Sequence, residues 1–194
     1  MDEGMPQEDV LAMQRLQTGD DLALNEIMAR WKQPLAGYLL RQLGNHDDAL
    51  DLTMETFVRI YQSRNRYTPS ARFSRWLFTI ATNLARNHVR WKARHPEVNL
   101  TTNQEDDSPL EDLLDDAPSA SRQLQTKERA AAVQQAISHL PPDLRTSLLL
   151  FEYEGLSHSE IASVEGCTAK AIETRLYRAR QFLAQKLAPW LKKI

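Results

Sequence analysis

The chain has 194 residues, of which 42% are hydrophobic and 26% are charged, and its formal net charge is -2 at pH 7. This size and balance fit a globular protein with one ordinary core or two small ones. No stretch approaches the roughly 18 consecutive apolar residues of a membrane-spanning helix, and the acidic start MDEGMPQEDV is unlike a secretory signal. We therefore expect a cytoplasmic protein with no membrane insertion of its own.

Cysteine and histidine usage argues against several kinds of site. The single Cys167 excludes an intramolecular disulfide and a zinc site of several thiolates. The five histidines are scattered, and no Ser-His-Asp, paired-metal or phosphate-loop pattern is present. We expect no catalytic residue, no metal and no cofactor, which makes an enzyme the weaker alternative.

The first part of the chain has the apolar periodicity of four helices and almost no strand signature. Apolar residues recur at three- and four-residue spacing, so each long segment has one face for a core and one for solvent. Phe73 and Trp76 are expected on the core face. The helices are expected from Pro6 to Gly19, from Asp21 to Leu43 with a kink at Pro34, from the capping region at Asp47 and Asp48 past Tyr61, and from Ala71 to Lys92.

Charge is distributed unevenly along the chain. Residues 1–94 contain 13 basic and 11 acidic side chains, residues 95–125 contain 1 and 8, and residues 126–194 contain 10 and 7. Between Phe57 and His95 there is no acidic residue but nine basic ones. A block of one sign attracts a polyanion such as nucleic acid, although a solvated face remains the alternative.

The middle of the chain lacks a sustained apolar period. The segment HPEVNLTTNQEDDSPLEDLLDDAPSAS, residues 95–121, combines prolines, small polar residues and most of the acidic excess. Such a composition indicates a flexible tether. The expected fold is therefore all-α, with one small helical domain at 1–94, an acidic linker at 95–125 and a second helical domain at 126–194.

The second domain contains the sequence layout of a helix-turn-helix. A helix from Lys127 to Leu140 is followed by Pro141-Pro142 and a further helix that reaches Gly155. Ser157 and Glu160 form a capping-box pattern that opens a short helix ending at Gly166, and Thr168 is placed to cap the last helix. The layout predicts DNA binding in the major groove, but the spacing alone also fits an ordinary helical hairpin.

Three segments resemble successive signatures of the extracytoplasmic-function sigma factors, which are bacterial transcription initiation factors. They are DALDLTMETFVRIYQS (48–63), FSRWLFTIATNLARNHVRWKAR (73–94) and LPPDLRTSLLLFEYEGLSHSEIASVEGCTAKAIETRLYRARQFL (140–183). The order and spacing of the three segments also match. The resemblance implies that the first domain is sigma region 2, which binds the minus-10 element, and that the second is region 4, which binds the minus-35 element.

The resemblance implies specific contacts to the minus-10 element and to core RNA polymerase. Melted DNA needs a polar side chain for a base edge beside an aromatic or apolar wall. The candidates for this role are Asn83 for the base, Tyr67 for the wall, and Arg86, Asn87 and Arg90 for the backbone or flanking bases. The candidates for polymerase docking are Asp51, Leu52, Glu55, Thr56 and Phe57. Met54 stands where the family usually has glutamine, which puts one docking contact in doubt.

The resemblance also implies a set of minus-35 contacts on the last helix. The candidates for these contacts are Lys170, Glu173, Thr174, Arg175, Tyr177 and Arg178. Arg180 is expected to reach phosphates, as is Arg175. Glu173 replaces the family's usual Lys or Arg, and because a carboxylate can accept from cytosine N4, an altered minus-35 preference is expected. Cys167 is expected to be a small buried turn residue.

The implied partners are core RNA polymerase, promoter DNA and an anti-sigma factor, and the acidic linker is expected to thread the polymerase's RNA path. Two alternatives stay open on the sequence alone. One is a conventional helix-turn-helix regulator that binds duplex DNA without core polymerase, and the other is a helical adaptor whose charge pattern is incidental. A sigma factor initiates transcription with core polymerase alone, whereas the regulator needs another sigma factor to be present. Salt-insensitive behaviour of the protein on DNA would favour the adaptor.

Overall fold

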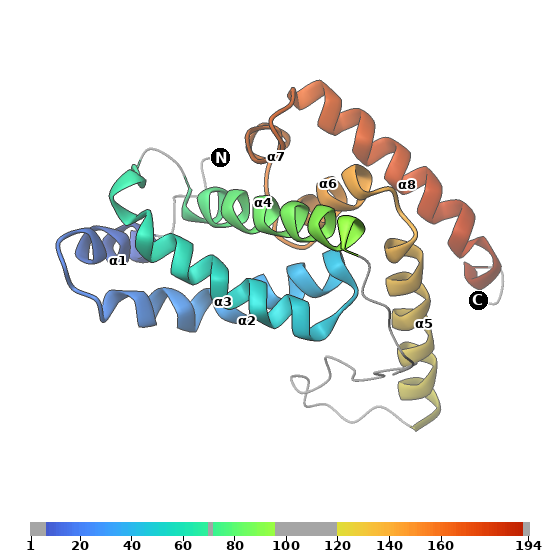
Figure 1. The fold of residues 1–194 in the computed structure, drawn as a ribbon. Helices are drawn as coiled ribbons and strands as arrows, with labels where there is room; N and C mark the ends of the chain where they lie inside the picture. Colours follow the sequence, from blue (N-terminus) through green and yellow to red (C-terminus); the bar gives the residue numbers. More distant parts are fainter. Residues whose placement is uncertain (1–6, 70–71, 96–119, 192–194) are drawn as a thin grey trace.

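The computed structural model describes residues 7–69, 72–95 and 120–191, and within them the chain is helical with no strand. The all-α prediction is therefore confirmed for the described residues. The elements are α1 (Gln7–Gln17), α2 (Ala23–Leu43), α3 (His46–Gln62), the 3-10 helix η1 (Arg64–Arg66), α4 (Phe73–Arg94), α5 (Ala120–Ser138), α6 (Pro142–Glu152), α7 (His158–Glu165) and α8 (Ala169–Leu191) (Figure 1).

The first half, α1 to α4, closes around an aromatic cluster. The centroid of the Trp31 ring lies 5.8 Å from that of Phe73 and 6.1 Å from that of Phe78. The hydroxyl of Tyr38 lies 2.8 Å from Thr82 Oγ1, so the buried ring keeps its polar atom paired. Burial raises the pKa of Tyr38 far above its ordinary value. This cluster fixes α2 against α4, a pairing that the apolar periodicity of the single helices did not predict.

Helix ends in this half follow local chemistry. Gly44 ends α2 in the left-handed conformation at φ 72°, and its N–H donates to the Leu40 carbonyl. The side chain of Asn45 accepts from the Asp48 N–H at 2.8 Å and so caps α3, whereas we expected Asp47 and Asp48 to mark the cap. Pro34 lies inside α2, which continues past it to Leu43.

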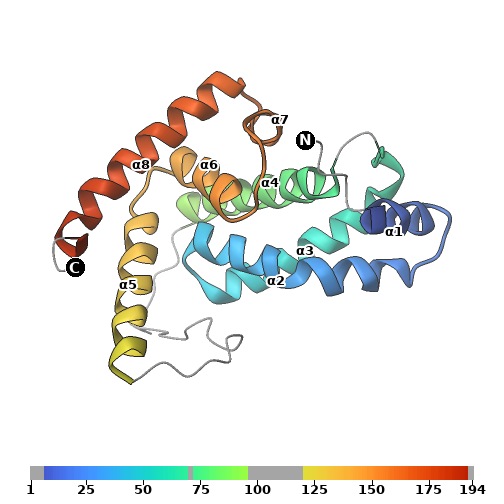
Figure 2. The same ribbon diagram turned by 180° about the vertical axis from the view of Figure 1, so that it is seen from behind.

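The second half contains α5 to α8, with α8 running along its outer edge (Figure 2). Its apolar core includes Leu149, Ile161 and Ile172, each fully buried. α5 begins at Ala120, inside the range 95–125 that we expected to be linker and before the expected start at Lys127. The rest of the expected linker, and its path along RNA, lie outside the described residues.

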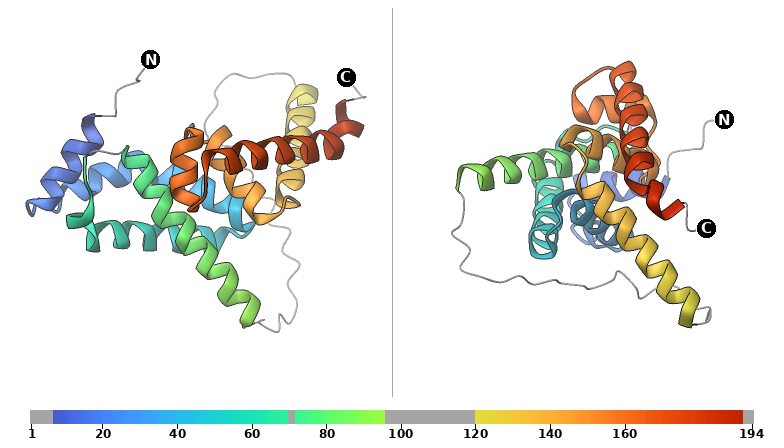
Figure 3. Two further views of the ribbon diagram at one scale, coloured as in Figure 1. Left: turned by 90° about the horizontal axis from the view of Figure 1, so that it is seen from above. Right: turned by 90° about the vertical axis from the view of Figure 1, so that its right-hand side faces the viewer.

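The two halves lie against each other, so the buried residues of both form one apolar cluster. α2 contacts α5 and α6, and α4 contacts α7. The view from above shows α7 crossing beside α4, with α8 continuing away from that crossing (Figure 3). No helix in the described part of the chain combines the length and apolarity needed to cross a membrane.

Candidate nucleic-acid and polymerase interfaces

Helices α7 and α8 form the expected helix-turn-helix. The Ser157 side chain accepts from the Glu160 N–H, and the Glu160 carboxylate accepts from the Ser157 N–H at 2.8 Å, which completes a capping box. Gly166 then turns the chain at φ 67°, a conformation that disfavours residues with a Cβ. Thr168 Oγ1 accepts from the Ala171 N–H at 3.2 Å and caps α8. These local interactions aim α8 away from α7.

The outward face of α8 carries most of the residues expected to meet the minus-35 element. Lys170, Glu173, Thr174, Tyr177 and Arg178 are all exposed. Lys170 Nζ lies 2.7 Å from Glu173 Oε2, and this hydrogen bond and charge hold the pKa of Glu173 below its ordinary value. Glu173 is thus an ionised acceptor on a surface that is otherwise basic or neutral.

Arg175, the sixth expected minus-35 residue, lies apart from this exposed face. Its guanidinium pairs with the buried carboxylate of Glu165, and its Nη2 lies 3.6 Å from Asp143 Oδ2. Only 25% of the Arg175 side chain is exposed. Arg175 therefore braces the helix-turn-helix from inside.

Arg180 and Cys167 lie next to the same motif. Arg180 Nη2 lies 2.8 Å from Glu152, and its guanidinium lies over the Phe151 ring at 5.3 Å, while the side chain stays 55% exposed. Cys167 is half-buried against the core with its sulfur 3.8 Å from an Arg175 nitrogen. In the part of the chain that is described, no three His, Cys, Asp or Glu side chains gather as a metal site would require.

A basic groove lies between α3 and α4 and contains the expected base-capturing residue. Asn83 and Asn87 are exposed and line a cavity of about 450 Å³. The other lining residues are Arg59, Gln62, Ser63, Arg66, Ile80 and Leu84. Sequence reasoning missed the α3 side of this groove, although Arg59 and Arg66 belong to the acid-free block and a pairing of α3 with α4 would have placed them there.

Two of the expected minus-10 residues do not face this groove. The Tyr67 ring is 3% exposed and packs 5.2 Å from the Trp76 ring, so it supports the core and offers no face to a base. Arg86 Nη2 lies 3.2 Å from Glu165 Oε2 of α7, with 27% of its side chain exposed. Arg90 is exposed as expected. Phe73 is buried and Trp76 packs against the core, as predicted.

Helix α3 splits the expected polymerase-docking residues between two faces. Asp51 is exposed, Leu52 is half-buried, and Glu55 is accessible while it pairs with Arg59 at 2.7 Å. Thr56 is fully buried, with its hydroxyl donating to the Leu52 carbonyl at 2.6 Å, and Phe57 is 2% exposed. The structure therefore places Thr56 and Phe57 in the core and not on the exposed face of α3.

The exposed face of α3 instead presents an apolar stripe that sequence reasoning missed. Leu50, Met54 and Val58 are exposed by 41%, 47% and 45% at four-residue spacing. Large apolar side chains aligned on one helix face are typical of a protein-docking surface. The four-residue recurrence was the signal in the sequence, and the apparent departure at Met54 is the middle of this stripe.

Comparison with known proteins matches both halves of the chain. The family model described as "Sigma-70 region 2" covers residues 27–95, and the model "Sigma-70, region 4" covers residues 130–183. The RNA polymerase sigma-H factor of Pseudomonas aeruginosa is 31% identical over 187 residues, which are 96% of this chain and 97% of that protein. The ECF RNA polymerase sigma-E factor of Haemophilus influenzae is 29% identical over 182 residues, 93% of this chain and 96% of that protein.

Two solved structures share the fold. CnrH, solved in complex with the cytosolic domain of CnrY, gives a TM-score of 0.67 at 24% identity and covers 94% of this chain and 98% of that one. The sigma factor RpoE of Bartonella quintana, solved with the anti-sigma factor NepR, gives a TM-score of 0.65 at 22% identity and covers 84% of this chain and 96% of that one. At these identities the likeness concerns the arrangement of helices.

Proposed function

Because the chain belongs to the family of RNA polymerase sigma factors, of the extracytoplasmic-function type, we propose a specific division of work between its surfaces. The protein is a promoter-directing initiation factor that acts with core RNA polymerase on promoter DNA. In the proposal, α3 and α4 serve polymerase docking and the minus-10 element, and α7 and α8 serve the minus-35 element. The corresponding domains are 1–94 and 126–194, joined by the acidic linker.

The minus-35 proposal rests on the face of α8. Lys170, Glu173, Thr174, Tyr177 and Arg178 are exposed together on the second helix of a helix-turn-helix, the helix that enters the major groove in this motif. Lys170 neutralises Glu173 in the free protein. On DNA, Lys170 turns to a phosphate or a guanine edge, and Glu173 accepts from a cytosine N4. That exchange predicts a cytosine within the preferred minus-35 sequence.

The minus-10 proposal rests on the groove between α3 and α4. Asn83 supplies donors and an acceptor for a base edge, Asn87 flanks it, and Ile80 and Leu84 form the apolar wall that we expected from Tyr67. Arg59 and Arg66 line the same groove and attract the phosphates of an unpaired strand. Arg90, exposed further along α4, extends this basic track.

The polymerase-docking proposal rests on the outer face of α3. Leu50, Met54 and Val58 provide apolar contact area, and Asp51 and Glu55 provide acidic groups at its edge. Leu52 is half-buried between the two faces of the helix. An apolar patch with a charged rim is the usual anatomy of a protein interface. Met54 is therefore a contact in this proposal, in place of the family's glutamine.

Three broader properties follow from family membership. Sigma factors are non-catalytic, so we infer that the chain is not an enzyme and carries no cofactor. We also infer a cytoplasmic location, where core polymerase and promoters are found. An anti-sigma factor is a further proposed partner, and the complex of Bartonella quintana RpoE with NepR is a precedent from a protein of similar fold.

Run-off transcription tests the proposed function. The purified full chain is mixed with core RNA polymerase and fragmented genomic DNA, and transcript start sites are mapped. We expect starts at promoters that share minus-35 and minus-10 sequences, and fewer starts from the same promoters with Asn83→Ala or Arg178→Ala. A regulator of the conventional helix-turn-helix kind needs a second sigma factor, so absence of specific starts with core enzyme alone contradicts the proposal.

A further inference from the structure

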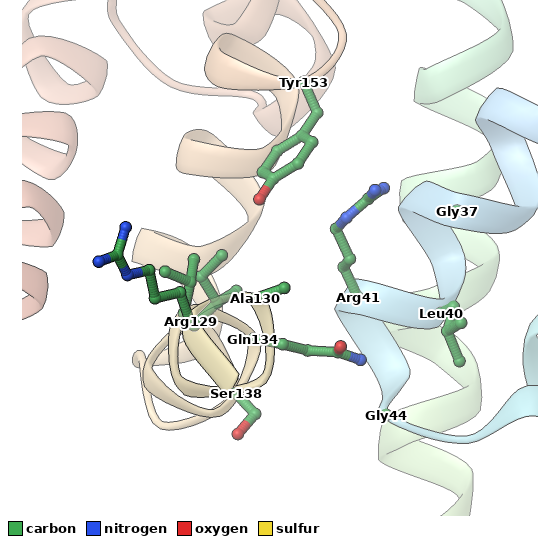
Figure 4. A pocket seen from close by; sticks show the side chains of 11 residues that line it. Gly37, Leu40, Arg41, Gly44, Arg129, Ala130, Gln134, Ser138 and Tyr153 are labelled. Atoms are coloured by element: carbon green, nitrogen blue, oxygen red, sulfur yellow. The ribbon is translucent and has the colours of Figure 1, made fainter. Parts of the chain in front are cut away.

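A tryptophan near the end of α4 lies exposed outside the surfaces described so far. Among the side chains that the structure describes, three aromatic ones are exposed: Trp91, Tyr153 and Tyr177. Tyr177 lies on the α8 face proposed for the minus-35 element. The guanidinium of Arg41 lies 4.2 Å from the centroid of the Tyr153 ring, and Figure 4 shows these two side chains pointing toward each other across a cavity of about 470 Å³ between α2 and α5. Trp91 is 46% exposed and belongs to neither place.

The Trp91 ring is held in position from one side. The imidazole of His95, one turn further along the chain, stacks on the indole with the two centroids 4.9 Å apart and the two planes at 24°. His95 Nδ1 also lies 3.0 Å from the Trp91 carbonyl oxygen, which fixes the imidazole against the end of the helix. A ring that is already ordered loses little conformational entropy when a partner binds. The indole is therefore prepared to receive a second planar group on its exposed surface.

Trp91 continues the line of side chains that forms the α4 side of the groove between α3 and α4. The residues of this line recur at spacings of four, three and four, which keeps them within about 60° of one another around the helix. They are Ile80, Leu84, Asn87 and Trp91. The first three line the cavity of about 450 Å³ that Asn83 also lines. A nucleic-acid strand that follows the groove along α4 therefore reaches the indole next.

The end of α4 around Trp91 is basic and projects from the body of the protein. Arg90 and Arg94 are exposed beside the ring, and α4 contains no acidic residue. Lys92 pairs with Asp48 of α3 and so anchors this end of the helix. Both views in Figure 3 show the last turns of α4, in light green, extending beyond the neighbouring helices. A large partner can therefore approach the indole without obstruction.

An exposed tryptophan can serve a protein partner or a nucleic acid, and the charge beside it decides between them here. The proposed polymerase-docking stripe on α3 has carboxylates at its edge, from Asp51 and Glu55. The Trp91 ring instead has guanidinium groups at its edge and lies in line with the proposed DNA groove. A polyanion is therefore the favoured partner, and an indole offers the stacking surface that unpaired bases use.

We propose that the Trp91 indole, backed by His95, stacks on an unpaired base of the melted promoter strand. The inference rests on the proposed minus-10 role of the groove between α3 and α4. Trp91 follows Asn83 by eight residues, which is about 12 Å along the helix at about 1.5 Å per residue. With bases stacked about 3.4 Å apart, the base on Trp91 lies about three or four nucleotides from the one that Asn83 captures. Stacking tolerates any base, so Trp91 adds affinity for the open strand without adding a sequence preference.

Fluorescence of 2-aminopurine tests the contact on the free, full-length chain. The protein is titrated at low salt into oligothymidine that carries one central 2-aminopurine, whose emission falls when an aromatic ring stacks on it. We expect Trp91→Ala to lower the affinity about tenfold and to reduce the quenching, and Trp91→Phe to restore part of both. Val89→Ala is the matched control, because Val89 is 49% exposed but lies about 160° from Trp91 around the same helix end.

Salt dependence separates stacking from charge. Stacking releases no counterions, so Trp91→Ala should leave the slope of log affinity against log salt unchanged. Arg90→Ala should lower that slope by about 0.7, the value for one phosphate contact on a single strand. Annealing a complementary strand hides the bases, and Trp91→Ala should then have little effect on the affinity.

The complex with core polymerase locates the contact on the promoter. The open strand of a mapped promoter carries 2-aminopurine at one position at a time, and the emission is compared between the unmodified chain and each variant. We expect the position affected by Trp91→Ala to lie about three or four nucleotides from the position affected by Asn83→Ala.

The outcomes separate the stacking contact from the sigma function. Unchanged affinity and quenching in folded Trp91→Ala overturn the contact, and the sigma function stands if the unmodified chain directs specific starts. An equal loss on single strand and duplex also overturns the contact. Weaker binding of Trp91→Ala to core polymerase without DNA overturns it as well, and assigns the ring to a protein partner. Quenching that depends on Trp91, in a chain that directs no promoter-specific starts, supports the contact and contradicts the sigma function.

Discussion

Helices α8 and α3 both carry residues that the sigma resemblance marks for contact, yet the structure treats the two sets differently. On α8, Arg175 is the one marked side chain held inside, while the others lie on the open face. On α3, Thr56 and Phe57 are in the core, and the open face belongs largely to residues that were not marked. The expected residues of α8 therefore lie mostly on its exposed face, whereas those of α3 are divided between the exposed face and the core.

The difference comes from how the positions are spaced around each helix. An α-helix turns about 100° per residue, so Leu52 and Glu55 lie about 60° apart, whereas Phe57 lies about 140° or more from both and cannot meet the same partner. Leu50, Met54 and Val58 advance by only about 40° at each step and share a face. On α8 the expected residues were chosen as outward positions of a helix-turn-helix, so the periodicity had already removed most core residues. The residues of a family motif include some that pack in the core and some that contact a partner, and their spacing along the helix distinguishes these two groups.

The sharpest contrast on α3 is between adjacent residues. Phe57→Ala is expected to lower the free energy of unfolding by about 3–5 kcal/mol, because a fully buried ring leaves a cavity. Val58→Ala, at a side chain that is 45% exposed, is expected to change it by less than about 1 kcal/mol. Urea denaturation followed by circular dichroism measures both. Equal losses for the two variants would mean that α3 is oriented differently from the structure.

On α8 the matching contrast is between two arginines. Arg175→Ala is expected to cost about 1–3 kcal/mol of stability, since the buried Glu165 loses a charged partner, with Asp143 also affected. Arg178→Ala is expected to leave stability unchanged and to reduce the salt dependence of minus-35 DNA binding by about one phosphate contact. Thermal melts and binding titrations at several salt concentrations give the two quantities. Loss of DNA binding in folded Arg175→Ala would restore that residue to the interface.

Most of the fold follows from local signals in the sequence. The capping box at Ser157, the left-handed Gly166 and the Thr168 cap are set by neighbours along the chain, and all three are found as expected. The apolar stripes also placed the core correctly. The start of α5 at Ala120 was missed because an acidic, proline-containing stretch precedes it, and the composition of a window cannot resolve where a helix begins.

The misplaced site residues depend on contacts far apart in the chain. Arg86 meets Glu165, and Tyr67 meets Trp76 in a loop-to-helix contact whose geometry no spacing rule supplies. The pairing of Arg86 with Glu165 requires that α7 lie on α4, and no signal in the sequence of either helix predicts that contact. Sequence periodicity fixes the face of one helix at a time, and the pairing of faces is a tertiary property.

Glu173 allows the open face of α8 to be tested for base reading. Glu173→Lys is expected to change the preferred minus-35 sequence, because it replaces an acceptor for cytosine by a donor; the discrimination at the affected base pair is about 1–3 kcal/mol. Selection from a randomised minus-35 library, with the unmodified protein in parallel, measures the preference. An unchanged selected sequence would show that Glu173 faces solvent when the protein is bound.

Met54 tests the stripe on α3 in the same way. Met54→Glu is expected to weaken binding to core polymerase by about tenfold, near 1.4 kcal/mol, because it adds a charge to an apolar contact. Stability should hardly change, since the side chain is 47% exposed. Fluorescence anisotropy with labelled protein measures the affinity, and Leu11→Glu, at an exposed leucine of α1, is the control. Equal affinities for Met54→Glu and the unmodified chain would remove the stripe from the docking surface.

The smallest expected effect contrasts an exposed acid on α8, Glu173, with a partly buried acid in the turn after α6, Glu154. Lys170 lowers the pKa of Glu173, whereas burial raises the pKa of Glu154 to about 7 despite the opposing charge of Arg41. Between the ordinary value of 4.5 and about 7, the folded protein binds the Glu154 proton more tightly than the unfolded chain does, so stability rises as the pH falls through 7 and the gain is complete near 4.5. Residual solvent screening limits it to about 1 kcal/mol. Urea titrations at pH 5 to 8 should therefore show a slope that Glu154→Gln flattens and Glu173→Gln leaves in place, because the pKa of Glu154 is raised and that of Glu173 is lowered. A slope that persists in Glu154→Gln would assign the proton to another buried group. Glu165 is the first to examine, since burial raises its pKa as well.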